Sequence, residues 1–131
     1  MPSSVQDGTK QFSSVFAHTD LLAWLQERSI DTVTLVGFMT NNCIIASAAE
    51  AEALGVSVEV LSDATGAINI VNAGGAVSAE TVHRTLMALL QSNLAAVAPT
   101  AEWTSALTAG VAIPGDALPT SAVAGTQRFP G

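Results

Sequence analysis

Cys43 is the only cysteine of the chain, and its position in the sequence favours chemistry. It lies in the segment VTLVGFMTNNCIIASAAEAEALG, where an apolar run passes through a glycine-containing turn into a stretch of helical composition. A cysteine among the first residues of a helix faces unpaired backbone N–H groups and the positive end of the helix dipole. Both favour the thiolate, the nucleophilic form of the side chain. Cys43 is therefore a candidate nucleophile, and the surrounding elements must supply its partners.

These elements alternate along the chain between helical and strand patterns. The sequence predicts helices over Thr19–Ser29, Asn42–Leu54, Ala79–Gln91 and residues 101–109, and strands over Thr32–Gly37, residues 56–60 and Leu94–Ala98. This order implies right-handed crossovers and a three-layer α/β fold, in which helices cover both faces of a parallel sheet. Ligands of such sheets bind beyond the carboxyl ends of the strands, which is where Cys43 falls.

The expected domain covers residues 1–110. Residues 1–18 are polar and predict a loop, and residues 111–131 combine prolines with small residues and predict an extended or mobile tail. The chain has 131 residues, of which 49% are hydrophobic, enough for a single packed core.

Charge and cysteine content exclude several classes of protein. The net charge of −7 disfavours binding to nucleic-acid phosphates or to anionic membrane surfaces. The sequence predicts no membrane span and no signal peptide, and a free thiol fits a reducing compartment, so a cytoplasmic protein is expected. The two histidines and the cysteine are too widely spaced for a metal-site pattern, and neither a metal nor another cofactor is expected.

Four segments together resemble one family. GFMTNNCIIASAAEAEALG is similar to the nucleophile segment of the isochorismatase-like cysteine hydrolases, which include nicotinamidases, N-carbamoylsarcosine amidohydrolase and streptothricin hydrolase. KQFSSVFAHTDL, from Lys10 to Leu21, resembles the family's motif of a lysine, then Ser and Phe, then Thr and Leu. VEVLSDATGAI resembles the strand that ends in Asp-Ala, and AETVHRTLMALLQSNLAAVAPTAEW the last helix and strand. The resemblance spans about Lys10 to Ala109 and implies the family's Rossmann-like fold.

The resemblance also implies catalytic residues. The family uses a triad of Asp, Lys and Cys, and Lys10 and Cys43 match two of these three positions. Cys43 would attack the carbonyl carbon of a small amide, while Lys10 would stabilise negative charge and assist proton transfer.

A backbone site is implied as well. The family's non-proline cis peptide falls on Phe38 and Met39, and it would turn the Met39 N–H toward the same point as the Cys43 N–H, forming an oxyanion hole. Thr40 and Asn41 would then border the substrate.

The aspartate of the triad has no match in this sequence. In the family it ends the first strand, well upstream of the lysine, and no strand of the form apolar-apolar-Asp precedes Lys10. Asp7 lies in a polar segment and is not assigned this role. A truncated reading frame, a fragment completed by another chain and a degenerate homologue are three explanations. The absence of the family's first strands would leave one edge of the Thr32–Gly37 strand open to pairing, and self-association into a homo-oligomer is expected.

Several of these residues also have ordinary structural interpretations. Free cysteines mostly act as small buried hydrophobes, and a lone lysine is usually solvated. Asp63 is expected to cap the loop after its strand rather than act as an acid. His18 and His83 have no acid or nucleophile near them in the sequence, so surface or packing roles are expected for both.

Other catalytic patterns are absent from the sequence. The chain has no Gly-x-Ser-x-Gly elbow of a serine hydrolase, and Gly74-Gly75 lacks the later glycine and lysine of a phosphate loop. The main hypothesis is a cysteine-dependent hydrolase of a small amide C–N bond that acts through a covalent Cys43 intermediate. The thiol favours amide over vinyl-ether hydrolysis, because relatives that cleave isochorismate typically lack it. The alternative is a catalytically impaired fragment with a structural or assembly role.

Overall fold

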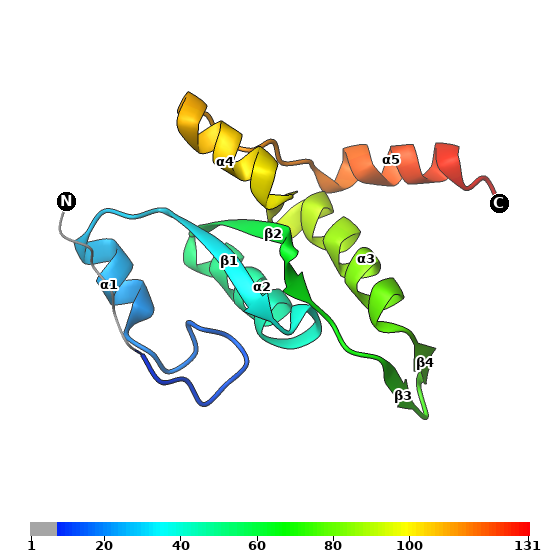
Figure 1. The fold of residues 1–131 in the computed structure, drawn as a ribbon, viewed down its shortest axis with the longest axis horizontal. Coiled ribbons are helices and arrows are strands. Elements are labelled where there is room, and N and C mark those ends of the chain that lie inside the picture. The colour runs from blue at the N-terminus through cyan, green and yellow to red at the C-terminus, as the bar shows by residue number, and fades with distance from the viewer. Residues whose placement is uncertain (1–7) are drawn as a thin grey trace.

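The computed structural model describes residues 8–131 and contains a parallel sheet flanked by helices (Figure 1). The sheet has the order β1-β2-β5, with β1 at Thr32–Phe38, β2 at Ser57–Gly66 and β5 at Ala96–Ala98. A separate antiparallel hairpin joins β3 (Ile70–Asn72) to β4 (Gly75–Val77). The helices are α1 (Leu21–Glu27), α2 (Ile45–Leu54), α3 (Ala79–Leu89), α4 (Thr100–Ala109) and α5 (Leu118–Arg128). Two π-helical turns, η1 (Thr40–Ile44) and η2 (Leu90–Leu94), lie next to α2 and α3.

The central strand β2 separates the two faces of the sheet. Val58 and Val60 pack in the core with α2, whereas Glu59, between them, accepts hydrogen bonds from Thr34 Oγ1 (2.7 Å) and from Trp103 Nε1 of α4 (3.1 Å). Alternate side chains of a strand face opposite sides of its sheet. Helices α2 and α4 therefore cover opposite faces, and the predicted α/β arrangement is confirmed.

The core lies on the α2 side of the sheet. Ala48 and Ala51 have no exposed surface, and these small side chains let α2 approach the strands closely. The helix ends at Gly55, whose φ of 74° is the left-handed conformation that glycine adopts at helix ends. The cluster that fills the core consists of Phe16, Leu25, Ile44, Ala48, Ala51, Val56, Val58, Val60 and Leu90.

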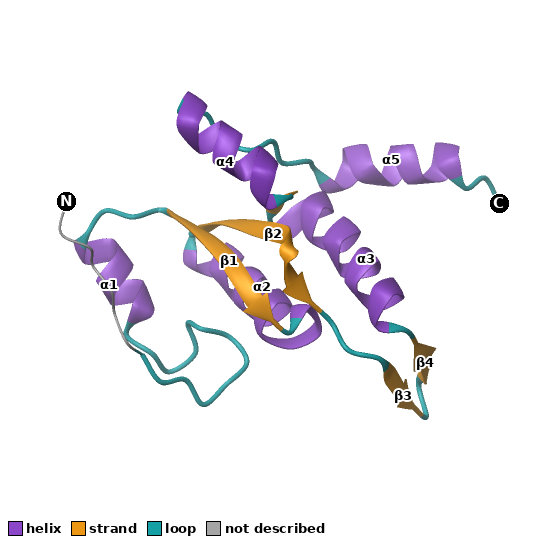
Figure 2. Ribbon diagram, in the orientation of Figure 1, coloured by secondary structure: helices purple, strands orange, loops and turns teal. Residues whose placement is uncertain are grey.

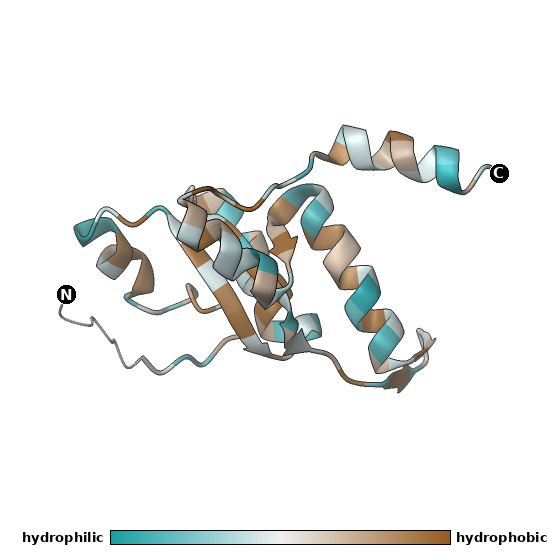
Figure 3. Cartoon of the chain, turned by 45° about the horizontal axis from the view of Figure 1, so that its top comes forward, coloured by the Kyte–Doolittle hydropathy of each residue, from teal (hydrophilic) through white to brown (hydrophobic). Residues whose placement is uncertain are grey.

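Strand β1 forms one edge of the sheet. Among residues 8–131, no strand pairs with its outer side. Val36 is 56% exposed and Phe38 is 66% exposed, and Figure 3 shows hydrophobic residues along this strand. An uncovered apolar edge of this kind is able to pair with another strand.

The structure differs from the sequence prediction at the C-terminus, where an extended or mobile tail is expected. Leu118–Arg128 form the helix α5, which extends away from the sheet (Figures 1 and 2). Pro119 lies in the first turn of this helix, where the missing N–H would have had no partner and the fixed φ suits a helix. The prediction was wrong here because a proline taken as a helix breaker instead begins one.

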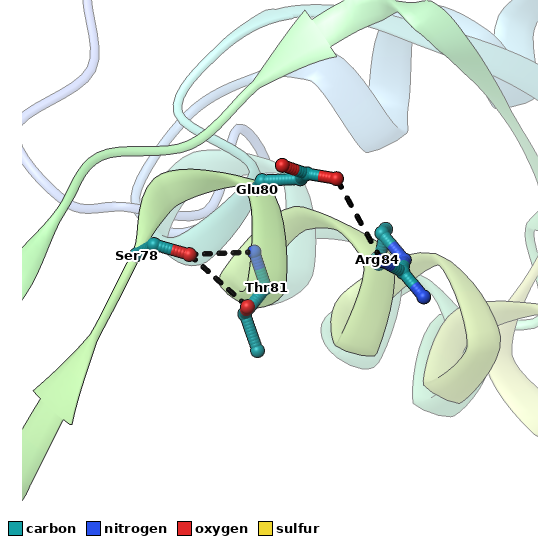
Figure 4. A network of polar contacts seen from close by, with 4 residues as sticks. All are labelled: Ser78, Glu80, Thr81 and Arg84. Atoms are coloured by element: carbon teal, nitrogen blue, oxygen red, sulfur yellow. Dashed lines mark hydrogen bonds and ion pairs between the residues drawn. The ribbon is translucent and has the colours of Figure 1, made fainter.

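Helix α3 has a well-defined start. The Ser78 hydroxyl accepts a hydrogen bond from the Thr81 N–H (3.2 Å) and lies 3.0 Å from Thr81 Oγ1 (Figure 4). Arg84 and Glu80, one turn apart, form an exposed ion pair at 3.6 Å. A serine cap is worth about 1 kcal/mol and such an exposed pair less, so the cap mainly defines the start of α3.

Gly37 generates a prediction about stability. Its φ is 118°, and it follows the register shift of β1 against β2 that begins at Leu35. A Cβ at this position would meet no atom within 4 Å, so only the backbone conformation opposes a side chain. We predict that Gly37→Ala lowers the free energy of unfolding by about 1–3 kcal/mol in urea denaturation.

Gly66→Ala is the matched control, because Gly66 pairs with Phe38 at the same end of the two strands. Its new Cβ would lie 3.8 Å from the Phe38 ring, an ordinary contact, and its φ is not positive. We expect a change within about 0.5 kcal/mol. Equal losses in the two variants would contradict the role assigned to Gly37.

Candidate active site

Lys10 and Cys43 are in direct contact. Lys10 Nζ donates a hydrogen bond to Cys43 Sγ over 3.2 Å, although the two residues are 33 positions apart. The same nitrogen donates to the Phe12 carbonyl over 3.2 Å. A cation in contact with sulfur stabilises negative charge on it. The structure thus brings together the two side chains that the sequence singled out for chemistry.

Cys43 lies on the turn η1 between β1 and α2. The strand ends at Phe38, the Phe38–Met39 peptide bond is cis, and Met39 has an extended backbone with φ −117° and ψ 144°. The Met39 carbonyl accepts hydrogen bonds from the N–H groups of Asn42 (3.2 Å) and Ile44 (3.3 Å). Single π-helical turns occur frequently at functional sites, and this one follows the carboxyl end of a parallel strand.

The residues after Lys10 hold its loop against α2. Phe16 is buried in the core, and its N–H donates to the Ser14 hydroxyl over 3.1 Å. The Val15 N–H donates to Ser47 Oγ over 3.0 Å, and Ser47, one turn beyond the thiol, is 1% exposed. The motif serine and phenylalanine are therefore anchors of the loop. They restrict where Lys10 can lie relative to α2.

Thr40 and Asn41, which were expected to border the substrate, differ in their surroundings. Thr40 is fully buried, so its side chain borders no open space in this structure. Asn41 is partly exposed, with Nδ2 3.8 Å from Met39 Sδ. Its Oδ1 is the one buried side-chain nitrogen or oxygen among residues 8–131 with no hydrogen-bond partner. Because Asn41 keeps some exposed surface and Thr40 keeps none, Asn41 is the better candidate for ligand contact.

Sequence reasoning missed the contacts of His83. Nε2 lies 2.9 Å from the Ser62 carbonyl oxygen, and Nδ1 lies 2.9 Å from Thr40 Oγ1. Since a carbonyl only accepts hydrogen bonds, we assign the ring hydrogen to Nε2, and Nδ1 accepts from the threonine hydroxyl. A signal was present in the sequence. His83 precedes Met87 and Leu90 by four and seven residues, on the core-facing side of α3, where a polar group needs a partner.

The other singled-out polar residues have structural contacts. Asp63 Oδ1 accepts hydrogen bonds from the Thr100 hydroxyl (2.7 Å) and the Thr100 N–H (2.8 Å), so Asp63 binds the start of α4. His18 packs its ring against Phe12, with ring centroids 4.9 Å apart. Among residues 8–131, no group of three or more His, Cys, Asp or Glu is arranged to hold a metal ion, and no helix is long and apolar enough to span a membrane.

The fold is shared with known proteins. The parallel sheet with helices on both faces places the chain among three-layer α/β proteins. A family model described as the isochorismatase domain matches residues 5–102. The chain therefore belongs to the isochorismatase family, as the resemblance predicted.

Solved structures support this assignment. A protein from Burkholderia xenovorans LB400 that has been assigned to the isochorismatases is similar at 41% identity with a TM-score of 0.86, covering 91% of this chain and 58% of that one. A cysteine hydrolase from Pseudomonas syringae is 33% identical with a TM-score of 0.73, covering 76% of this chain and 47% of that one. A pyrazinamidase/nicotinamidase from Streptococcus mutans is 33% identical with a TM-score of 0.55, and the match covers 68% of this chain and 44% of that one. The chain spans about half the length of these structures.

Asp63 generates a prediction about acid stability. The hydrogen bonds from Thr100, first its hydroxyl and then its N–H, hold the pKa of Asp63 below the ordinary value of 3.8. Stability from this carboxylate is therefore present above about pH 4 and is lost as the pH falls through the lower, folded-state pKa. We predict that Asp63→Asn lowers the thermal midpoint near neutral pH and that its difference from wild type shrinks in acid.

Thr100→Val is the partner variant for this experiment. It removes the hydroxyl that contributes most to the lowered pKa, so the acid-dependent part of the Asp63→Asn effect should be smaller in its background. A difference between Asp63→Asn and wild type that stays constant from neutral to acid pH would contradict the assignment.

Proposed function

We propose that this chain is a cysteine-dependent hydrolase that cleaves the C–N bond of a small amide, with Cys43 as the nucleophile. The observation that carries the proposal is the 3.2 Å contact between Lys10 Nζ and Cys43 Sγ on the turn after β1. Membership in the isochorismatase family supports it, and so do relatives that are named cysteine hydrolase and nicotinamidase. Structural relatives of a family often differ in substrate, so the site itself must carry the functional argument.

The proposed first step forms a covalent intermediate. The Cys43 thiolate attacks the amide carbonyl carbon, and the backbone N–H groups of Met39 and Cys43 donate to the resulting oxyanion. The C–N bond then breaks, and the Lys10 ammonium gives its proton to the departing nitrogen. This leaves a thioester on Cys43, a released amine and a neutral Lys10.

The second step restores the side chains. The neutral Lys10 takes a proton from water, and the hydroxide equivalent attacks the thioester carbonyl. Collapse of this intermediate releases the carboxylic acid and regenerates the thiolate. The partly exposed Asn41 would border the substrate. In this scheme Lys10 serves as acid and then as base, so each step balances without the upstream aspartate of the family triad.

A second candidate function is assembly without catalysis. The observation that favours it is that β1 has no partner strand on its outer side among residues 8–131, while its side chains Val36 and Phe38 are exposed. A second chain that added a strand there would pair the free backbone groups of β1 and cover part of these side chains. Sedimentation measures this assembly independently of activity.

The catalytic proposal is tested by ammonia release from a panel of small carboxamides. Nicotinamide belongs in the panel because one structural relative is named for it. We expect Cys43→Ala to reduce the rate to background, and Lys10→Ala to reduce it by about 100-fold or more, as for loss of a general acid.

Arg28→Ala is the matched control, because Arg28 is another cation but lies over the Trp24 ring, with its guanidinium carbon 4.1 Å from the ring centroid. Its activity should equal that of the wild type. A folded wild-type chain that hydrolyses no amide in the panel, yet sediments as an oligomer, would favour assembly over catalysis.

A further inference from the structure

We propose that His83 is a positioning residue for Cys43. By holding the Thr40 hydroxyl against the backbone of β2, His83 fixes the turn that carries the thiol. This inference rests on the proposed role of Cys43 as nucleophile, and it adds a residue from α3 to the site.

The hydrogen bonds of His83 connect three elements that are distant in the sequence. Through Nδ1 it reaches Thr40, 43 residues away, at the start of η1. Through Nε2 it reaches the Ser62 carbonyl of β2, 21 residues away. Both distances are 2.9 Å, in the range of good hydrogen bonds. The ring therefore links the central strand β2 to the turn η1, which carries Cys43.

Thr40 is the residue through which His83 can fix the position of Cys43. It is fully buried, three residues before Cys43 in the same turn, and its hydroxyl is paired with the histidine. A buried hydroxyl that loses its partner carries a free-energy penalty, so the turn would shift to find another one. A shift at Thr40 is transmitted directly to Cys43, because one turn of helix contains both.

The helix that carries His83 is held near both ends. Ser78 caps its start through Thr81 (Figure 4), and Leu90, immediately after its end, is fully buried in the core. The imidazole is thus fixed relative to β2 as well as to η1. Sites supported by well-packed elements hold their geometry better than sites on loops.

The hydrogen bonds also argue against proton transfer by His83. Nδ1 accepts from Thr40 and Nε2 donates to Ser62, so neither nitrogen is left for a substrate. The histidine acts through Thr40 and is not a catalytic residue.

The test measures the rate at which iodoacetamide alkylates Cys43, which requires no substrate. We expect His83→Ala to slow the reaction because the turn no longer holds Sγ against Lys10 Nζ. His83→Asn supplies a side-chain oxygen near the position of Nδ1 and should restore part of the rate. Thr40→Val should behave like His83→Ala, and Thr40→Ser, which keeps the hydroxyl, should behave like wild type.

A double-mutant cycle separates positioning from general loss of stability. Lys10→Ala should slow alkylation in the wild type but less in the His83→Ala background, with a coupling of about twofold or more, the lower end for residues in one network. Met87→Ala is the control, since Met87 lies one turn beyond His83 on the same helix and packs against the core without these hydrogen bonds. Met87→Ala should show no coupling to Lys10→Ala, even if it lowers the thermal midpoint as much as His83→Ala does.

Two results would overturn the proposal. One is an unchanged alkylation rate in both His83→Ala and Thr40→Val, and the other is equal coupling for His83→Ala and Met87→Ala. If His83→Ala does not fold, the alkylation rates of Thr40→Val and Thr40→Ser test the proposal instead, and equal rates in these two variants would overturn it. Failure of amide hydrolysis with the coupling intact would remove the proposed function but leave His83 as the residue that positions the thiol.

Discussion

The contact between Lys10 Nζ and Cys43 Sγ is the interaction on which the proposed function depends. This contact alone is too weak to fix the position of the lysine side chain. Exposed pairs that involve a lysine contribute at most about 1 kcal/mol, and ordering a flexible lysine side chain costs entropy of similar size. Burying a phenylalanine such as Phe16 contributes about 1.5–3 kcal/mol. The partly buried hydrogen bond between the Val15 N–H and Ser47 Oγ adds a second anchor. The core and this bond therefore position the lysine, and the contact follows from them.

The sequence predicted the parts of the fold that depend on local patterns. The alternation of Val58 and Val60, the alanine-rich helix that ends at Gly55 and the apolar run of β1 all appear in the expected elements, although β2 begins at Ser57 and continues to Gly66. Lys10 and Cys43 were found by motif, and the structure brings them together. Helix α5 was missed because Pro119 has opposite meanings at the start and in the interior of a helix.

The remainder of the site could not be predicted because it depends on long-range contacts. The burial of Thr40 is visible only once α3 and η1 are packed together, and no local pattern pairs it with a histidine 43 residues later. The same holds for Ser47, which looks like an ordinary helix residue until the loop after Lys10 donates to it. These polar residues are buried because each has a partner, and the partner comes from another element.

The central claim is that Cys43 forms a covalent bond with the acyl part of an amide. Its most direct test is the intact mass of the chain after acid quenching during exposure to a small carboxamide. We predict a mass increase equal to the acyl group, located on the peptide that contains Cys43 and absent from Cys43→Ala. Amide hydrolysis that continues at the wild-type rate in Cys43→Ala would contradict the claim.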